Sequence, residues 1–198
     1  MLYSDSGNSW WVTIYDTDGN RNDIEMRTHS NFDRSKIFLS GFSEEMCFYD
    51  HAYYDSGANV KIDLSRYEDK KIAGGMFNQG YAPLYIEGAD GKNYFTIIDS
   101  QGNEVFSPIL GSPASSFGEG FLIVRLESGC ALFNTAGEKV LETPYNIAGT
   151  MAYEEHSLMD WTANHSPYTV SDGYFIACKD GSSIPTVFVG VDGSYIGQ

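Results

Sequence analysis

One pattern recurs along the chain: a run of β-favouring residues that meets a glycine turn. Residues 77–87 and 117–127 both read Phe-x-x-Gly-aromatic, continue through an apolar-rich run that ends in glutamate, and start 40 residues apart. Residues 95–105 and 130–140 both lead into an Asp/Asn-x-x-Gly turn followed by a valine, and their turn glycines stand 35 residues apart. Self-similarity at a period of about 20 to 50 residues is typical of repeat proteins and propellers. The fold must therefore accommodate several copies of one small unit.

Weaker copies lie on both sides of these segments. Residues 12–19 have the same run-and-turn form, and Phe42 begins a copy in which Glu45 stands in place of glycine. Residues 172–178 resemble the glycine-aromatic strand, and residues 187–193 resemble the strand that enters the turn. We therefore expect a single domain over residues 1–198. Its imperfect units are expected at about 9–41, 42–76, 77–116, 117–172 and 173–198.

Each copy has the composition of a short antiparallel hairpin or meander. Valine, isoleucine, phenylalanine and tyrosine favour extended backbone, while Asp/Asn and glycine supply the side-chain acceptor and the positive φ of a tight turn. A unit of about 35 residues buries little of its own apolar face, so such units stack. We predict an all-β fold of tandem antiparallel hairpin or meander repeats, arranged as a propeller-like ring or an open array. The predicted turns lie at Asp18-Gly19, Gln101-Gly102, Ala136-Gly137 and Asp192-Gly193.

The central segments resemble the WG-repeat family, whose units read roughly Trp-Gly-Tyr-Ile-Asp-x-x-Gly-x-x-Val, then Pro or Tyr, then Phe-x-Glu-Gly and a strand. The matching positions are residues 97–105, Pro108, residues 117–120, residues 132–140 and Pro144-Tyr145. Phe95-Thr96 and Cys130-Ala131 replace the Trp-Gly pair, so the chain resembles a divergent member. The likeness covers residues 77–145 closely and the remainder loosely. It implies a repeat scaffold used for binding, often in bacterial surface or envelope proteins, and it implies no catalytic residue.

Both ends of the chain carry strands that need a partner. Residues 10–12 and 195–196 are apolar, and an unpaired apolar edge attracts other chains. A propeller-like ring solves this by pairing the first strand with the last, whereas an open array needs polar caps. Residues 5–10 are also similar to the Asp-box turn of sialidase-type propellers, a structural motif. We therefore expect the two termini to lie close together, with an open array as the alternative.

The charge balance excludes one class of partner. With 12 Lys+Arg against 27 Asp+Glu the net charge is −15, and nucleic-acid binding needs clustered basic residues. No apolar run reaches the roughly 20 residues of a membrane-spanning helix. The low pI and the few lysines favour an extracellular or envelope protein of a bacterium, with a signal or anchor absent from this numbering. A free cysteine favours the cytoplasmic alternative.

The residue types that commonly bind metals do not have the spacing of a metal site in this sequence. The three cysteines are isolated among apolar neighbours and are expected to be buried, and the four histidines form no ligand pair. Residues 16–20 look like a calcium loop, but Arg21 and Arg27 stand where an EF-hand needs glycine and glutamate, so a hairpin turn is the better interpretation. The pairs Glu44-Glu45 and Glu154-Glu155 are expected to be solvated, because adjacent carboxylates do not face each other across a cleft. We predict no metal, no cofactor and no catalytic residue.

One interval is longer than the period allows. Gly137 and Gly193 are 56 residues apart, which leaves an insertion near residues 146–169 and a short helix expected at about 151–162. Insertions in repeat arrays gather on the binding face. The resulting ligand-binding candidates are Tyr153, His156, Asp160 and Trp161. The alternative is that this helix plugs the sheet, with its tryptophan in the core.

A second pair of candidates comes from the first strand. Trp10 and Trp11 are neighbours, so one of the two side chains should be exposed, where it could stack on a sugar or anchor a protein. A well-packed edge is the alternative. We predict a non-catalytic binding module for a protein or glycan partner. The alternatives are a structural spacer of a larger bacterial envelope protein and, least favoured, a hydrolase with dispersed carboxylates.

Overall fold

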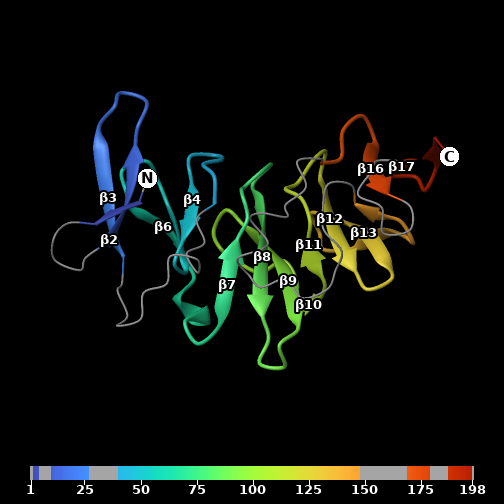
Figure 1. Ribbon diagram of the computed structural model, residues 1–198, viewed down its shortest axis with the longest axis horizontal. Helices are drawn as coiled ribbons and strands as arrows, with labels where there is room; N and C mark the ends of the chain where they lie inside the picture. The colour runs from blue at the N-terminus through green and yellow to red at the C-terminus, as the bar shows by residue number, and fades with distance from the viewer. Residues whose placement is uncertain (1, 5–9, 27–39, 148–168, 179–186, 198) are drawn as a thin grey trace.

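The computed structural model describes residues 2–4, 10–26, 40–147, 169–178 and 187–197, which form an all-β structure (Figure 1). The predicted fold class is confirmed at this level. Among the described residues the only helical segment is the 3-10 turn η2 (Ser65–Tyr67). The helix expected at about 151–162 lies outside the described residues.

Within the described ranges the strands form five small antiparallel sheets. The first sheet contains β1 (Leu2–Ser4), β2 (Trp10–Tyr15) and β3 (Arg21–Met26), in that order. The second contains β4 (Cys47–Tyr49), β5 (Ala52–Tyr54) and β6 (Val60–Asp63). The third has the order β10 (Ile109–Leu110), β9 (Asn93–Asp99), β8 (Tyr81–Glu87), β7 (Lys71–Gly74). The fourth contains β11 (Ser112–Pro113), β12 (Phe121–Leu126), β13 (Gly129–Asn134) and β14 (Lys139–Thr143). The fifth contains β15 (Asn146–Ile147), β16 (Tyr174–Cys178), β17 (Val187–Gly190) and β18 (Tyr195–Ile196).

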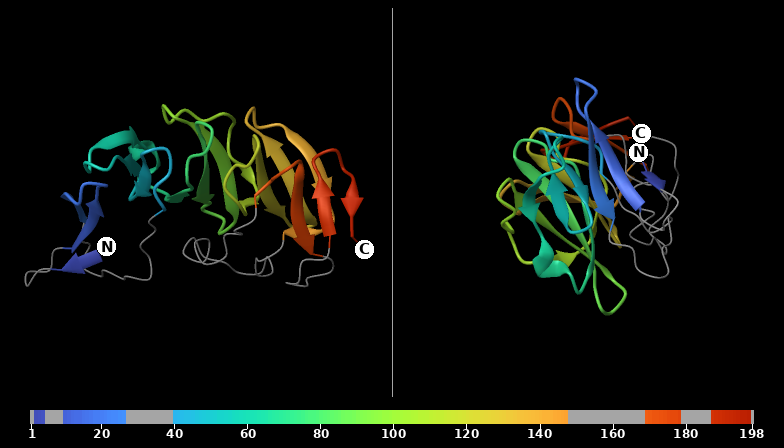
Figure 2. Two further views of the ribbon diagram at one scale, coloured as in Figure 1. Left: turned by 90° about the horizontal axis from the view of Figure 1, so that it is seen from above. Right: turned by 90° about the vertical axis from the view of Figure 1, so that its left-hand side faces the viewer.

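The five sheets follow one another in sequence order along the long axis of the molecule (Figures 1 and 2). None of them is closed, and the first and last sheets lie at opposite ends. The expectation that the termini lie close together is therefore wrong. The physical reason is that β1 and β18 each find a partner within their own sheet, β2 and β17, so ring closure is not required to pair the terminal strands.

All four predicted glycine turns are present. In each one the glycine has a φ between 78° and 84°, and its amide donates to the carbonyl oxygen three residues earlier at 2.9 to 3.1 Å. A positive φ is open to glycine at little cost. A fifth turn of this form spans Asp55 to Asn59, with Ala58 in the glycine position at a φ of 62°.

The core lies between successive sheets. Phe95 and Ile97 of β9 pack against Leu122, Val124 and Ala131 of the fourth sheet, and all five are fully buried. Successive side chains of a strand point to opposite faces, so the neighbouring residues of β12 and β13 face the fifth sheet. Both faces of the fourth sheet are therefore buried, which explains why β12 and β13 are nearly continuous apolar runs.

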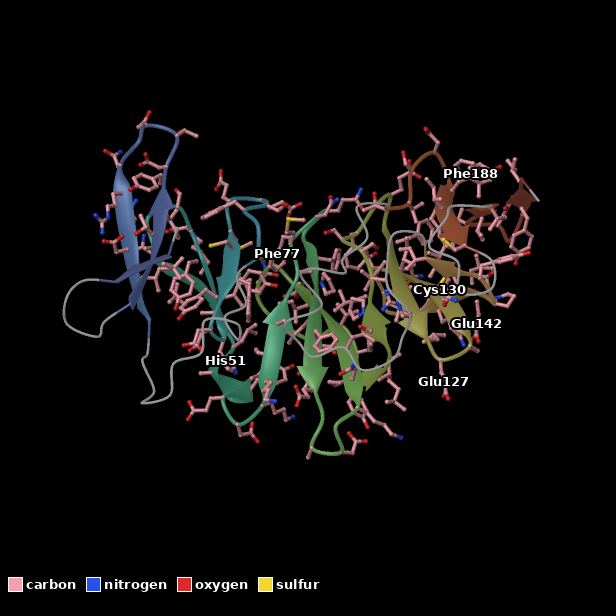
Figure 3. The ribbon with its side chains drawn as sticks, viewed as in Figure 1. His51, Phe77, Glu127, Cys130, Glu142 and Phe188 are labelled. Carbon is pink, nitrogen blue, oxygen red and sulfur yellow. The ribbon has the colours of Figure 1, made fainter. Side chains whose placement is uncertain are left out.

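The three cysteines, Cys47, Cys130 and Cys178, are buried, as predicted, and form no disulfide. Burial raises the pKa of the Cys47 thiol to about 11 and that of Cys130 to about 12. Thiols with such pKa values carry almost no thiolate at neutral pH and are poor nucleophiles. They serve as small apolar residues; Cys130, labelled in Figure 3, belongs to the core between the last two sheets.

The unit boundaries expected from the sequence stay a prediction. β7 pairs with β8 across the turn at residues 78–81, although the sequence pattern begins its unit at Phe77. A sheet can thus take its first strand from the segment that precedes the recognisable pattern.

Candidate functional site

The structure does not bring the predicted binding residues together. Tyr153, His156, Asp160 and Trp161 lie outside the described residues. Trp10 and Trp11 lie on β2, paired with Met26 and Glu25 of β3, but their side chains are not among those described. These six residues stay predictions, and the site must be sought elsewhere in the described part of the chain.

The calcium-like loop is a hairpin turn, as predicted. Oδ1 of Asp16 accepts hydrogen bonds from the backbone amides of Asp18 and Asn20 at 3.0 and 2.8 Å, and Oδ2 accepts one from Nδ2 of Asn20 at 2.8 Å. The hydrogen bonds from the side chain and the backbone of Asn20 lower the pKa of Asp16. Both oxygens of this carboxylate therefore already accept hydrogen bonds within the turn.

The same arrangement, an Asp-Asn turn, occurs at two further hairpins. Asp55 accepts hydrogen bonds from the amides of Gly57 and Asn59 at 2.9 Å. Asp99 accepts them from the backbone amide of Asn103 at 2.8 Å and, through Oδ2, from its side chain at 3.0 Å. The hydrogen bonds from Asn59 lower the pKa of Asp55. Partial burial acts to raise the pKa of Asp99, but the hydrogen bonds from Asn103 lower it overall.

In the turn of the fourth sheet the positions of the amide and the carboxylate side chains are interchanged. Oδ1 of Asn134 accepts from the amides of Ala136 and Glu138 at 3.0 and 2.9 Å, and its Nδ2 donates to the carboxylate of Glu138 at 2.8 Å. The amide now stands at the first position and the carboxylate at the fifth. The carboxylates of these four turns are thus engaged in holding the turns.

A second kind of turn joins one sheet to the next through glutamate. Both central residues of the turns at 44–45, 79–80, 119–120 and 172–173 have a positive φ. The carboxylate of Glu44 accepts from the amide of Gly80 at 3.0 Å, and that of Glu119 accepts from the amides of Asp172 and Gly173 at 2.7 and 2.9 Å. Glu44 is thus exposed but engaged, whereas the sequence predicted only solvation. The pair at 154–155 lies outside the described residues.

In a third kind of contact between sheets, an apolar side chain of one sheet packs against the turn glycine of the next sheet. A Cβ at Gly102 would overlap Ile62, and one at Gly137 would overlap Phe106. Ile62 and Phe106 each stand seven residues after the aspartate that opens their own turn, Asp55 or Asp99. Leu141 holds the same place after Asn134, and a Cβ at Gly193 would lie 3.6 Å from it. The glycine is needed both for its positive φ and for the space that this side chain occupies.

The last sheet leaves one apolar face open. Ile176, Phe188 and Ile196 are direct neighbours across β16, β17 and β18, and Tyr174 stands two residues before Ile176 on the same face. Phe188 is 49% exposed and Ile196 is 54% exposed, while Tyr174 and Ile176 are half-buried. We call these four side chains the open face. Phe188 is labelled in Figure 3, at the end of the molecule where no described strand lies beyond the sheet.

The corresponding face of the fourth sheet is covered. Ile123, Leu132 and Leu141 are direct neighbours across β12, β13 and β14, and with Phe121 they pack against the fifth sheet. Ile123 and Leu132 are 0% exposed. The open face thus presents the same kind of surface that an inner sheet buries, which makes it the candidate site.

One face of the first sheet carries a polar cluster, in which Thr13 is only 5% exposed. Oγ1 of Thr13 donates to Asp23 at 2.7 Å, and Arg21 forms an ion pair with Asp23 at 3.0 Å. Tyr15 lies opposite Arg21 on this face. This cluster contrasts with the apolar side chains of the open face.

Within the described ranges there is no group of three His, Cys, Asp or Glu side chains that could hold a metal ion. No helix in those ranges is long and apolar enough to cross a membrane. The envelope location stays a prediction. Comparison of the chain with protein-family models, with curated proteins and with solved structures finds no match.

The sequence did contain a signal for the open face. Residues 187–190 read Val-Phe-Val-Gly, and aligning them with the strand before Asn134 places Phe188 where Leu132 stands. The alignment shows that both positions are apolar. It does not show that one is covered by a following sheet while the other is not, because that depends on the direction in which the sheets stack.

Proposed function

We propose that the chain is a non-catalytic protein-interaction module made of tandem β-sheet units, a divergent relative of the WG-repeat family. Its binding surface is the open face. The observation that carries this proposal is the 49% exposure of Phe188, which stands where the fourth sheet has the fully buried Leu132, with the exposed Ile196 beside it. Exposed apolar clusters of this kind are typical of interaction sites.

The tandem organisation is supported by contacts that recur between successive sheets. Side chains seven residues after one turn pack at the glycine of the next turn, at Gly102, Gly137 and Gly193. Carboxylates of one two-residue turn accept from the amides of a following one, at Glu44 and Glu119. Recurrent nearest-neighbour contacts are the basis of repeat-protein stability.

A protein partner fits the open face better than a glycan. Two of its four side chains, Ile176 and Ile196, are aliphatic, and the hydroxyl of Tyr174 is its one polar side-chain group. Sugars need several hydrogen-bonding groups beside an aromatic ring, whereas apolar and aromatic side chains dominate the centres of protein interfaces. A structural spacer does not require an exposed apolar surface at its end. A hydrolase would need free carboxylates, whereas the aspartates of the turns already accept hydrogen bonds.

The proposal is tested by photo-crosslinking from the open face. Full-length protein with Phe188→p-benzoylphenylalanine is irradiated in an extract of the organism that supplies the gene, and the matched control carries the same group at Tyr15. We expect a discrete polypeptide adduct from position 188, prevented by excess wild-type protein and not by excess Phe188→Glu protein. Equal labelling from both positions, or no adduct from position 188, would contradict the proposal.

A further inference from the structure

One histidine ring joins the second sheet to the third. Asp50 and His51 form the two-residue turn between β4 and β5, and both have a positive φ, 39° and 65°. Nε2 of His51 lies 3.0 Å from the carbonyl oxygen of Lys70, the residue directly before β7, and Nδ1 lies 3.3 Å from Oδ1 of Asp50. The side chain of His51 is 25% exposed and is labelled in Figure 3, close to where the two sheets meet. The ring therefore connects the tip of a hairpin to the start of the next sheet.

The two acceptors require two protons on this ring. A carbonyl oxygen and an ionised carboxylate only accept hydrogen bonds, and a neutral imidazole has a single N–H. The neutral ring of His51 must therefore either turn a lone pair towards Asp50 or lose its donor to Lys70. The imidazolium form donates to both and also forms an ion pair with the carboxylate. The geometry thus favours the protonated ring, in a residue whose charge ordinarily changes near neutral pH.

The surroundings of the ring act in the same direction. The hydrogen bond to Asp50 raises the pKa of His51 above its ordinary value of 6.5; burial acts against this rise, while the carbonyl groups of Lys70 and Tyr67 and the charge of Asp50 add to it. The cationic groups of Arg66 and Lys70 lie over the ring of Tyr67, 5.0 and 5.7 Å from its centre. The other charged residues on these elements are exposed: Asp63, Glu68, Asp69 and Lys71.

A second hydrogen bond between the same two sheets does not titrate near neutral pH. The hydroxyl of Tyr53, a fully buried residue of β5, donates to the carbonyl oxygen of Gly75 at 2.9 Å, just beyond the other end of β7. Burial raises the pKa of this hydroxyl well above its usual range, so it stays protonated. The segment that contains β7 is thus attached to the second sheet on both sides of the strand, and a change of pH near neutrality affects the attachment at Lys70 alone of these two.

We propose that His51 is a pH-sensitive latch between the second and third sheets, closed when its ring carries two protons and loosened when it loses one. Because the pKa is raised in the folded state, the latch contributes fully below the ordinary value of 6.5 and is lost as the pH rises through the folded pKa. This inference goes beyond the proposed function and does not depend on the open face, so the two stand or fall separately.

Nuclear magnetic resonance of the imidazole groups in the full chain tests the first step. The chain has four histidines, and the signal of His51 is the one missing from His51→Gln. This variant suits the turn because Gln79 already occupies a comparable turn position at a φ of 57°. We expect the pKa of His51 to lie above 6.5 and to be lowered in Asp50→Asn, which keeps an acceptor but removes the charge. Circular dichroism checks that both variants fold.

Amide hydrogen exchange tests the latch itself. The amide of Leu64 donates to the carbonyl oxygen of His51 at 2.8 Å and reports on the latch, while the amide of Gly75 donates to Pro83 at 2.8 Å and is the internal control. After correction for intrinsic rates, the protection of Leu64 relative to Gly75 should fall at least about 3-fold between pH 6 and pH 8.5. In His51→Gln, whose side-chain amide does not titrate, this ratio should stay constant.

Three results would overturn the inference. The first is a pKa of His51 at or below 6.5, and the second is a pKa that Asp50→Asn leaves unchanged. The third is a ratio of Leu64 to Gly75 protection that varies with pH equally in the wild type and in His51→Gln.

Discussion

At the scale of single residues, hydrogen bonding decides what the acidic side chains do. Asp16, Asp55 and Asp99 look like dispersed carboxylates in the sequence, yet each accepts hydrogen bonds from its own turn. The sequence predicts the turns at Asp16 and Asp99 correctly because Asp-x-x-Gly is a local signal with a local cause, whereas the turn at Asp55, with Ala58 in the glycine position, was not predicted. Asn134 and Glu138 show that the signal is a donor–acceptor pair rather than a particular residue.

Replacing Asp99 by alanine should lower the free energy of unfolding by about 1 kcal/mol at neutral pH, since hydrogen bonds to the turn amides are lost. The pKa of Asp99 is lowered in the folded state, so its contribution is complete above the ordinary value of 3.8 and is lost as the pH falls through the folded pKa. The difference in stability between wild type and Asp99→Ala should therefore be constant from about pH 7 to 5 and shrink below about pH 4.

Urea titrations at a series of pH values measure this difference. Asp69→Ala, at an exposed aspartate in the turn after η2, is the matched control and should change stability little at any pH. A difference for Asp99→Ala that persists undiminished at pH values well below 3.8 would show that the ionised carboxylate is not what stabilises the turn.

At the scale of elements, the sequence predicts what lies inside a hairpin and misses what joins one hairpin to the next. The sequence predicts the four glycine turns because a positive φ and the spacing of the turn residues are local properties. The contact between Phe106 and Gly137 joins residues 31 positions apart and leaves no local signature. For the same reason the sequence could not foresee that Glu119 reaches the turn amides of Asp172 and Gly173.

Gly137→Ala should therefore be much more destabilising than Gly19→Ala. Both glycines have similar φ angles, 78° and 82°, so both substitutions incur the left-handed penalty of about 1 to 2 kcal/mol. A Cβ at Gly137 also overlaps Phe106, whereas nothing lies within 4 Å of a Cβ at Gly19. Overpacking adds about 1 to 3 kcal/mol, and chemical denaturation measures the difference.

The double variant Phe106→Ala/Gly137→Ala isolates the contact. Removing the ring should abolish the extra loss, so the effect of Gly137→Ala in the Phe106→Ala background should fall to that of Gly19→Ala. Equal effects of Gly137→Ala with and without the ring would mean that backbone conformation alone requires this glycine.

At the scale of the whole molecule, the row of sheets is open, and the expectation from the sequence that the two termini lie close together is wrong. The apolar residues 10–12 and 195–196 favoured closure, but β2 finds partners in β1 and β3, and β18 finds one in β17. Pairing within each end sheet removes the need for a ring. The six binding residues expected from the sequence remain untested.

An open row should be least stable at its first sheet. β8, β9, β12 and β13 belong to sheets with a neighbour on each side, whereas the described residues place a neighbour on one side only of β2 and β3. Sheets that contact one neighbour open more readily. We expect the amides of β2 and β3 to exchange with deuterium at least about 10-fold faster than those of the inner strands, after correction for intrinsic rates. Uniform protection would mean that the row unfolds as one unit.

The ion pair at the first sheet has one more consequence. A rod whose two ends fit each other grows into a fibre, because every added molecule presents a fresh end to the next. The Arg21–Asp23 ion pair, whose side chains are 46% and 29% exposed, would lose its hydration if an apolar end docked against it. Stacking of the open face of one molecule on this ion pair of another is therefore disfavoured, and this works against growth into a fibre.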